Sequence, residues 1–295
     1  MADPHPMAWL NDSLVPLKEA RISPLDRGFL YADSVYEVVP VYEGRPFLLV
    51  EHCSRLDRSL AAIGMEPVHT ASEWAAILAT LIAANGGSDM YIYLQVSRGA
   101  QYGRNHAVPE GLEPTIFAFA APLPEEYPAQ DTPGISAITQ PEWRWGRCDI
   151  KSTSLLPNVL SKTQAAAVGA TEAIFLADGF LHEGSSSAIL VIKGDTLYAP
   201  EETNAILPST SRALVVKLAA AAGLSVVVAP VPVELLRSAD EIWMSSATRP
   251  LMPITRLDGL RVGSGTVGAH WLQVRQRFDQ YRRDIASLPA LAGRN

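Results

Sequence analysis

CDIKSTSLLPN, residues 148–158, is the stretch on which the fold assignment depends, because it leads from a short apolar strand through a lysine into a polar turn and a helix. Lys151 would therefore lie at the end of a strand, partly shielded from water. Loss of hydration penalises an ammonium, so a lysine in such a place can present a free amine to a carbonyl carbon. Most lysines are instead solvated surface charges. Position alone leaves both interpretations open.

A second group of polar residues follows at the end of a predicted β-hairpin. Residues 173–177 form an apolar strand, Asp178-Gly179 is typical of a two-residue hairpin turn, and residues 180–184 return with Glu183 near their end. Three serines at 185–187 then precede another apolar strand. They are either a solvated loop or hydrogen-bonding groups at the mouth of a buried strand. The carboxylate and hydroxyl groups together favour a catalytic role for Lys151.

Two features could bind a phosphate group. Residues 208–211 (PSTS) precede a predicted helix, so the free N–H groups of Thr210 and Ser211 could face an anion that the helix dipole favours. The alternative is that Ser209 or Thr210 merely caps this helix. The other feature is Arg55, which lies on the polar side of a predicted helix over residues 52–63 and carries a guanidinium that can bind two phosphate oxygens.

The composition is that of an ordinary globular protein. The chain has 295 residues, of which 48% are hydrophobic, and this is enough for one large or two moderate domains. A net charge of −7 without a basic cluster argues against a nucleic-acid partner. The two cysteines do not form a CxxC motif and are expected to be reduced.

Several other classes of protein are not supported. The N-terminal residues lack the pattern of a secretion signal, so we expect a cytoplasmic location. The longest apolar stretch, residues 214–231, is interrupted by Lys217, Gly223 and Pro230, which indicates a helix followed by a strand and no membrane span. The six histidines show no metal-ligand spacing, and neither GxGxxG nor a P-loop occurs, which argues against a metal hydrolase or a nucleotide-binding module.

The order of predicted elements indicates an α/β protein of two domains. Predicted strands over residues 9–15, 35–42 and 46–50 and two helices, the second with a Thr70 to Glu73 capping box, indicate a small α+β N-terminal domain over residues 1–122. Residues 123–133 are polar and rich in proline and are interpreted as the interdomain linker. Residues 134–295 mix hairpin strands with helices and form the larger, mixed α/β C-terminal domain.

Several ordered motifs resemble those of the class IV aminotransferases. This fold-type IV family of pyridoxal-phosphate enzymes includes branched-chain and D-amino-acid aminotransferases and aminodeoxychorismate lyase. The likeness extends over nearly the whole chain, through residues 20–29, 33–38, 51–56, the Lys151 and Glu183 segments, 206–212 and 245–248. The resemblance implies two domains, the second a pseudo-barrel, with pyridoxal 5'-phosphate bound at their interface.

The resemblance also assigns roles to individual residues. Lys151 would form a Schiff base with the cofactor, and Glu183 would keep the pyridine nitrogen protonated so that the ring accepts electrons from Cα. Ala247 stands where many relatives carry a hydroxyl, so a backbone N–H or the Ser246 hydroxyl would replace that contact. The implied cofactor-binding residues are Arg55, Glu183, Leu207, Thr210, Ser211, Ser246 and Ala247, and no metal is expected.

Residues 97–106 (SRGAQYGRNH) bear on which substrate is bound. Taken alone, an arginine and a histidine in a loop are solvated residues. Within the resemblance, Arg104 and His106 look like the carboxylate trap of D-amino-acid aminotransferases, with Tyr36 as a third donor. This loop is contributed across a dimer interface in the family, so a homodimer with shared active sites is implied.

The predicted reaction moves the amino group of a D-amino acid such as D-alanine to a 2-oxo acid such as 2-oxoglutarate by a ping-pong mechanism. Branched-chain or (R)-amine aminotransferase and aminodeoxychorismate lyase remain alternatives within the fold. A cofactor carrier that has lost turnover is a further alternative.

Overall fold

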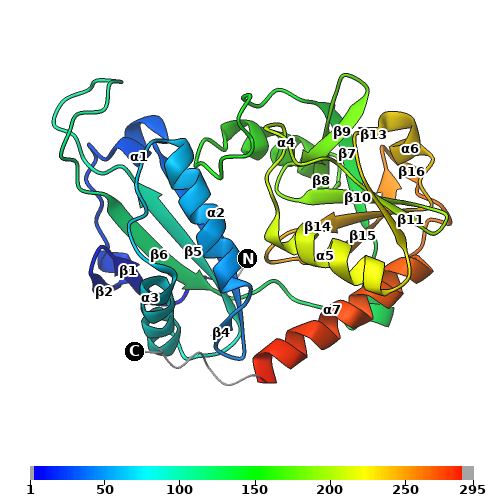
Figure 1. The fold of residues 1–295 in the computed structure, drawn as a ribbon, viewed down its shortest axis with the longest axis horizontal. Coiled ribbons are helices and arrows are strands. Elements are labelled where there is room, and N and C mark those ends of the chain that lie inside the picture. The colour runs from blue at the N-terminus through cyan, green and yellow to red at the C-terminus, as the bar shows by residue number, and fades with distance from the viewer. Residues whose placement is uncertain (1–2, 288–295) are drawn as a thin grey trace. The chain divides into compact units, whose positions relative to one another are not determined.

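The computed structural model describes residues 3–287, which fall into two compact units (Figure 1). Of these residues, unit 1 contains 3–124, 150–154 and 284–287, and unit 2 contains 125–149 and 155–283. The segment 150–154, which carries Lys151, therefore belongs to unit 1, although the chain on both sides of it belongs to unit 2.

Unit 1 is built on a six-stranded antiparallel sheet with the strand order β2-β1-β6-β5-β3-β4. The strands are β1 (Met7–Leu10), β2 (Ser13–Pro16), β3 (Ser34–Tyr42), β4 (Arg45–Pro46), β5 (Met90–Ser97) and β6 (Thr115–Ala121). The sequence pattern favoured a single strand over residues 9–15. That expectation is wrong, because Asn11 adopts a left-handed backbone with φ 53° and turns β1 back on β2.

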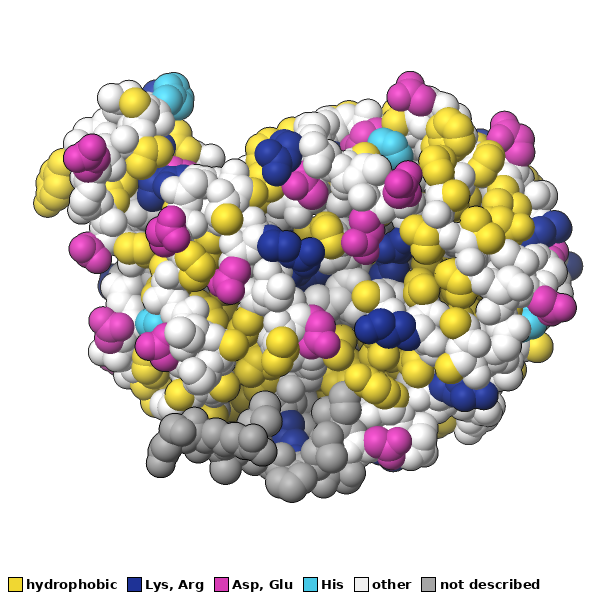
Figure 2. Space-filling model, viewed as in Figure 1, with side chains coloured by type: hydrophobic (Ala, Val, Ile, Leu, Met, Phe, Trp, Pro, Cys, Tyr) yellow, Lys and Arg dark blue, Asp and Glu magenta, His cyan; other side chains and the backbone are white. Residues whose placement is uncertain are grey.

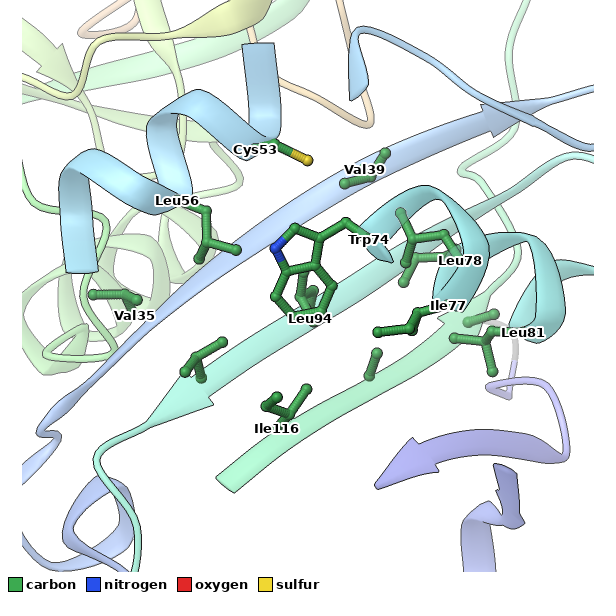
Figure 3. Close-up of a cluster of buried hydrophobic side chains, with 14 of the residues drawn as sticks. Val35, Val39, Cys53, Leu56, Trp74, Ile77, Leu78, Leu81, Leu94 and Ile116 are labelled. Atoms are coloured by element: carbon green, nitrogen blue, oxygen red, sulfur yellow. The ribbon is translucent and has the colours of Figure 1, made fainter. Parts of the chain in front are cut away.

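Two helices each pack one face against the sheet and so form the core of unit 1 with it. They are α2 (Leu49–Ala62) and α3 (Ala71–Ala84), and the shorter α1 (Arg27–Tyr31) and the 3-10 helix η1 (Leu17–Glu19) complete the unit. The predicted capping box at the start of α3 is confirmed, with Thr70 and Glu73 bonded reciprocally. Figure 3 shows Trp74 of α3 and Leu56 of α2 pointing toward Leu94 and its neighbours on the sheet. Their burial fixes α2 and α3 against the sheet.

Unit 2 contains a ten-stranded mixed sheet with the order β12-β11-β10-β14-β15-β7-β8-β9-β13 and with β16 paired to β15. The pairs β11·β12, β15·β7 and β7·β8 are parallel, and the others are antiparallel. The strands are β7 (Ile135–Pro141), β8 (Glu172–Ala177), β9 (Phe180–Gly184), β10 (Ala188–Lys193), β11 (Thr196–Ala199), β12 (Ser225–Val228), β13 (Val231–Pro232), β14 (Glu241–Ser245), β15 (Met252–Leu257) and β16 (Leu260–Arg261). The predicted hairpin turn at Asp178-Gly179 is confirmed, with φ values of 51° and 83°.

The helices of unit 2 are α4 (Leu156–Ala167), α5 (Thr210–Ala221), α6 (Val233–Arg237) and α7 (Ala269–Ser287), together with the 3-10 helix η2 (Ala129–Asp131). One buried cluster contains Val215 of α5, Trp243 of β14 and Trp271 of α7. A second cluster contains Ile174 of β8, Val191 of β10 and Leu236 of α6. Alternate residues of β10 and β14 thus enter different clusters, as expected for a sheet buried on both faces.

Charge is mixed on the visible surface. On the face shown in Figure 2, Lys and Arg side chains are scattered among Asp and Glu side chains and do not gather in one patch. Within residues 3–287, no helix has both the length and the apolar character needed to cross a bilayer.

Candidate active site

Lys151 is held in unit 1 by its backbone. Its carbonyl oxygen accepts a hydrogen bond from the Tyr36 N–H at 2.9 Å, and its own N–H donates to Ser59 Oγ at 3.2 Å. Ser152 forms an isolated antiparallel bridge with Val35 of β3. The Lys151 Nζ lies 4.2 Å from the centroid of the Tyr36 ring. The structure therefore brings Lys151 and Tyr36 together, and the amine rests on the face of an aromatic ring.

Arg55 lies near this segment on α2, but it is buried, contrary to its expected place on the polar side of the helix. Its Nε and Nη2 donate to the two carboxylate oxygens of Glu37 on β3, each at 2.7 Å. His52, one turn earlier, places Nδ1 2.7 Å from Glu37 Oε2. The side chains of these residues are at most 4% exposed. A carboxylate that projects from the sheet is thus the reason why the guanidinium can be buried.

The cluster of Glu37, His52 and Arg55 has perturbed protonation equilibria. Burial alone would raise the pKa of Glu37, but the Arg55 guanidinium and the His52 contact hold it far below its usual range. Burial lowers the pKa of His52, and its contact with Glu37 offsets this only in part. Glu37 is therefore ionised and His52 neutral at pH 7, and a fixed ion pair orients Arg55.

The candidate substrate residues Arg104 and His106 lie in the loop 101–106 of unit 1. Both are exposed, and both flank the ring of Tyr31 on α1. The Arg104 Cζ is 5.4 Å from that ring's centroid, and the His106 ring centroid is also 5.4 Å away. The structure thus brings Arg104 and His106 to one aromatic side chain, which is that of Tyr31 and not that of Tyr36.

Glu183 occupies β9 of unit 2 and is almost fully buried. Arg144 Nη1 donates to its Oε1 at 2.6 Å, and the Leu207 N–H donates to its Oε2 at 3.1 Å. Arg144 also forms a bidentate pair with Glu142, and its Cζ lies 4.4 Å from the centroid of the Phe175 ring. The predicted residues Glu183 and Leu207 are thus brought together, and Arg144 connects Glu183 to a second carboxylate.

The two carboxylates that share Arg144 differ in acidity. Burial raises the pKa of Glu183, and the hydrogen bonds from Arg144 and Leu207 offset this only in part. Burial also acts on Glu142, but hydrogen bonds from His182 and Arg144 lower its pKa to about 2. Glu142 is therefore ionised at neutral pH, and Glu183 is the more basic of the two carboxylates.

The serines at 185–187 are not a solvated loop. All three hydroxyl groups donate to the carboxylate of Glu172 on β8, which has no exposed surface. The Ser187 contact is 2.8 Å, and Lys162 forms an ion pair with the same carboxylate at 3.3 Å. This network closes the turn that directly follows Glu183 and so fixes the end of β9.

The N-terminus of α5 carries Thr210 and Ser211. Ser209 is the N-cap, and its Oγ accepts from the Arg212 N–H at 3.2 Å, so the capping interpretation holds for Ser209. The first N–H groups of α5 still lack intrahelical acceptors. Ser245, fully buried at the end of β14, has a hydroxyl with no hydrogen-bond partner among residues 3–287. Ser246 is engaged with Arg249 in the next turn, and Ala247 follows it.

Comparison with known proteins assigns the family. Residues 34–257 match the model of the class IV amino-transferases. The D-alanine aminotransferase of Bacillus licheniformis is 38% identical over 258 residues, which cover 88% of this chain and 90% of that protein. The D-alanine aminotransferase of Staphylococcus epidermidis is 35% identical over 274 residues, with coverages of 92% and 96%.

The fold agrees with this assignment. The T.th. branched-chain amino acid aminotransferase, solved with pyridoxamine 5'-phosphate, has a TM-score of 0.85 and 26% identity, and the match covers 94% of this chain and 93% of that one. The chain therefore belongs to the class IV aminotransferases. It is an α/β fold-type IV, pyridoxal-phosphate-dependent transaminase, which confirms the fold, the cofactor and the enzyme class expected from the sequence.

The residues of both units suit this cofactor chemically. Unit 1 offers an amine at Lys151, and unit 2 offers a buried carboxylate at Glu183, the start of α5 and the Ser245 hydroxyl, which is unpartnered within the described part of the chain. An amine, a carboxylate for a ring nitrogen and donors for a phosphate are the groups that pyridoxal phosphate requires. Among residues 3–287, no group of three or more His, Cys, Asp or Glu is arranged to hold a metal ion.

Sequence reasoning missed the partners that hold these groups in place. Glu37, Arg144 and Glu172 each bond to residues that lie 13 or more positions away along the chain. One signal was present on α2, where His52, Arg55 and Ser59 recur at helical spacing on a face that otherwise contains core residues. No comparable pattern linked Arg144 to Glu183.

Proposed function

We propose that this transaminase moves the amino group of a D-amino acid such as D-alanine to a 2-oxo acid such as 2-oxoglutarate in two half-reactions. The observation that carries the proposal is the 35–38% identity to D-alanine aminotransferases over about nine-tenths of the chain. Pyridoxal phosphate, when bound, supplies the aldehyde that takes up the amino group and the ring that stabilises the electron pair released at Cα.

Lys151 would hold the cofactor covalently through Nζ in this proposal. When free, the same nitrogen would take the proton from Cα, since a free amine can act as a general base. The hydrogen bonds of the Lys151 backbone with Tyr36 and Ser59 support this role, because a base must return to one position in every cycle. The Tyr36 ring keeps the amine close to the strand.

Glu183 would keep the ring nitrogen protonated, and its raised pKa suits a carboxylate that must share a proton. Leu207 would pack against the ring, and its N–H orients Glu183. The phosphate is bound by Arg55, by Thr210 and Ser211 at the start of α5, by the Ser246 hydroxyl and by the Ala247 N–H. These roles come from the family resemblance. In this structure Arg55 also donates to Glu37, and the Ser246 hydroxyl is engaged with Arg249.

Tyr36, Arg104 and His106 bind the substrate α-carboxylate in this proposal, and so select the face of Cα that meets Lys151. Because relatives in the family contribute this loop across a dimer interface, we also propose a homodimer with shared active sites. A cytoplasmic location completes the proposal. The two buried cysteines, which are unpaired, agree with a reducing compartment.

The direct test supplies the purified holoenzyme with D-alanine and 2-oxoglutarate and measures pyruvate. We expect pyruvate with D-alanine and much less with L-alanine, and none with Lys151→Ala protein that still binds the cofactor. Absence of pyruvate with the wild-type protein contradicts the proposal. A protein that shows the cofactor's absorbance band but no half-reaction with any amino acid is a carrier without turnover.

A branched-chain aminotransferase is the second candidate, because the solved neighbour with a TM-score of 0.85 bears that name. L-leucine as amino donor separates the two, since it should give 4-methyl-2-oxopentanoate only if this candidate is correct. Parallel assays with an (R)-amine donor and with aminodeoxychorismate test the remaining alternatives in the family.

A further inference from the structure

The guanidinium of Arg27 lies buried beneath the loop 101–106, with its side chain only 4% exposed. Its Nη1 donates to Gln101 Oε1 at 2.5 Å and to the Asn105 carbonyl at 2.8 Å. Its Nη2 donates to the His106 carbonyl at 3.0 Å. One side chain therefore joins the first residue of the loop to the last two.

The start of the loop is also tied to the segment that carries Arg27. The Arg27 N–H donates to the Gly99 carbonyl at 2.9 Å, and the Gln101 N–H donates to the Leu25 carbonyl at 3.2 Å. Asp26 and Ala100 form an antiparallel bridge. These backbone bonds hold the entry to the loop, whereas its residues 105 and 106 are held by the Arg27 side chain.

Tyr31, one turn after Arg27, contacts the side chains of Arg104 and His106. The Arg27 Cζ lies 4.8 Å from the Tyr31 ring centroid, and Arg104 and His106 lie 5.4 Å from it. The planar fork of Arg27 fixes the loop backbone, and the Tyr31 ring then defines where the Arg104 and His106 side chains rest.

We propose that Arg27 is a positioning residue for substrate recognition. By fixing the carbonyl groups of Asn105 and His106, it sets the directions in which Arg104 and His106 can meet a substrate carboxylate. This inference rests on the proposed role of those two residues. A planar carboxylate needs its donors at fixed positions, and a misplacement of about 1 Å can cost roughly a hundredfold in efficiency.

A merely structural role for Arg27 would be to neutralise Asp33, whose Oδ2 accepts from Arg27 Nε at 2.8 Å. Arg98 provides the matched control for that role. Its Nε also donates to Asp33 Oδ2 at 2.8 Å, but its Nη2 donates to the Ile63 carbonyl, so this arginine anchors the end of α2. The two arginines share one carboxylate and differ in what else they hold.

The experiment compares Arg27→Lys with Arg98→Lys in the holoenzyme. Lysine keeps the positive charge near Asp33 but cannot span Gln101, Asn105 and His106. We expect the KM for D-alanine to rise roughly ten- to hundredfold in Arg27→Lys with kcat nearly unchanged, and to stay at the wild-type value in Arg98→Lys. Gln101→Met, which removes a single acceptor, should raise the KM in the same direction by a smaller factor.

A second readout does not depend on turnover. Amide hydrogen exchange of peptides that contain residues 101–106 should be faster in Arg27→Lys and unchanged in Arg98→Lys. An unchanged KM and exchange rate in Arg27→Lys, or an equal rise of KM in both variants, overturns the inference. Wild-type protein that makes no pyruvate from D-alanine refutes the proposed function instead, and the exchange rates then show separately whether Arg27 anchors the loop.

Discussion

Replacement of Glu37 by glutamine should destabilise α2 strongly. The substitution keeps the shape of the side chain but deprives Arg55 of its carboxylate partner, which now accepts two hydrogen bonds of 2.7 Å and contacts His52. Removal of one partner of a buried ion pair costs about 3–5 kcal/mol. We expect the free energy of opening of α2 to fall by about this amount, which is a roughly hundred- to several thousandfold faster amide exchange.

Amide hydrogen exchange of peptides from Leu49–Ala62 measures this effect at neutral pH. Glu51→Gln is the matched control, since Glu51 lies on the same helix but is exposed. Its loss should cost less than about 1 kcal/mol, the size of a helix-dipole contribution. A Glu37→Gln effect no larger than that of the control would refute the argument that the ion pair holds α2.

The pH dependence of amide exchange in α2 follows from the lowered pKa values of Glu37 and His52. The pKa of Glu37 is lowered in the folded state, so its stabilisation is fully present above its unfolded value of 4.5 and is lost as the pH falls below it. The pKa of His52 is lowered too, so its contribution is present above 6.5 and starts to disappear below that pH. Wild-type α2 should therefore become less protected with acid, and Glu37→Gln should flatten the lower part of this profile.

Three further substitutions test other parts of the two units. Glu183→Gln should slow the D-alanine half-reaction roughly ten- to hundredfold in stopped-flow absorbance, because it removes one charge-assisted hydrogen bond of about 1.5–3 kcal/mol. A wild-type rate would contradict the role of Glu183 at the ring nitrogen. Glu172→Ala should leave the hydroxyl groups of Ser185, Ser186 and Ser187 without their acceptor and destabilise unit 2 by about 1–3 kcal/mol in urea unfolding, whereas an unchanged midpoint would show that water replaces the carboxylate. Gly99→Ala should destabilise unit 1 by about 1–3 kcal/mol, because φ is 96° and an added Cβ would overlap the Glu113 carbonyl. Gly103→Ala should cost less, because Gly103 has a similar φ of 97° but open space around the added Cβ.

Local structure was the part of the fold that the sequence predicted well. The Asp178-Gly179 turn, the Thr70 to Glu73 capping box and the end of α5 before Gly223 depend on neighbours along the chain, so their signals are local. The prediction of a strand over residues 46–50 is wrong. Of these, only Pro46 pairs with β3, and α2 already begins at Leu49, because Leu48 turns the chain with φ 54°.

The candidate site was only partly predictable, because its supporting residues are paired across long stretches of chain. The family motifs pointed to Lys151 and Glu183, but nothing near Glu183 in the sequence indicates that Arg144 donates to it. Arg27 is a similar case. It belongs to a motif that helped to define the family, yet its bonds to residues 101, 105 and 106 depend on the folded loop.

The placement of residues 150–154 in unit 1 has a consequence for how the enzyme matures during synthesis. The first 124 residues contain all six strands of the unit 1 sheet and the helices α1, α2 and α3, but they lack Lys151. Lys151 reaches β3 only after the chain has already started unit 2. A truncated N-terminal product would therefore be chemically inert toward an aldehyde at this position, and reactivity would arise only late in translation.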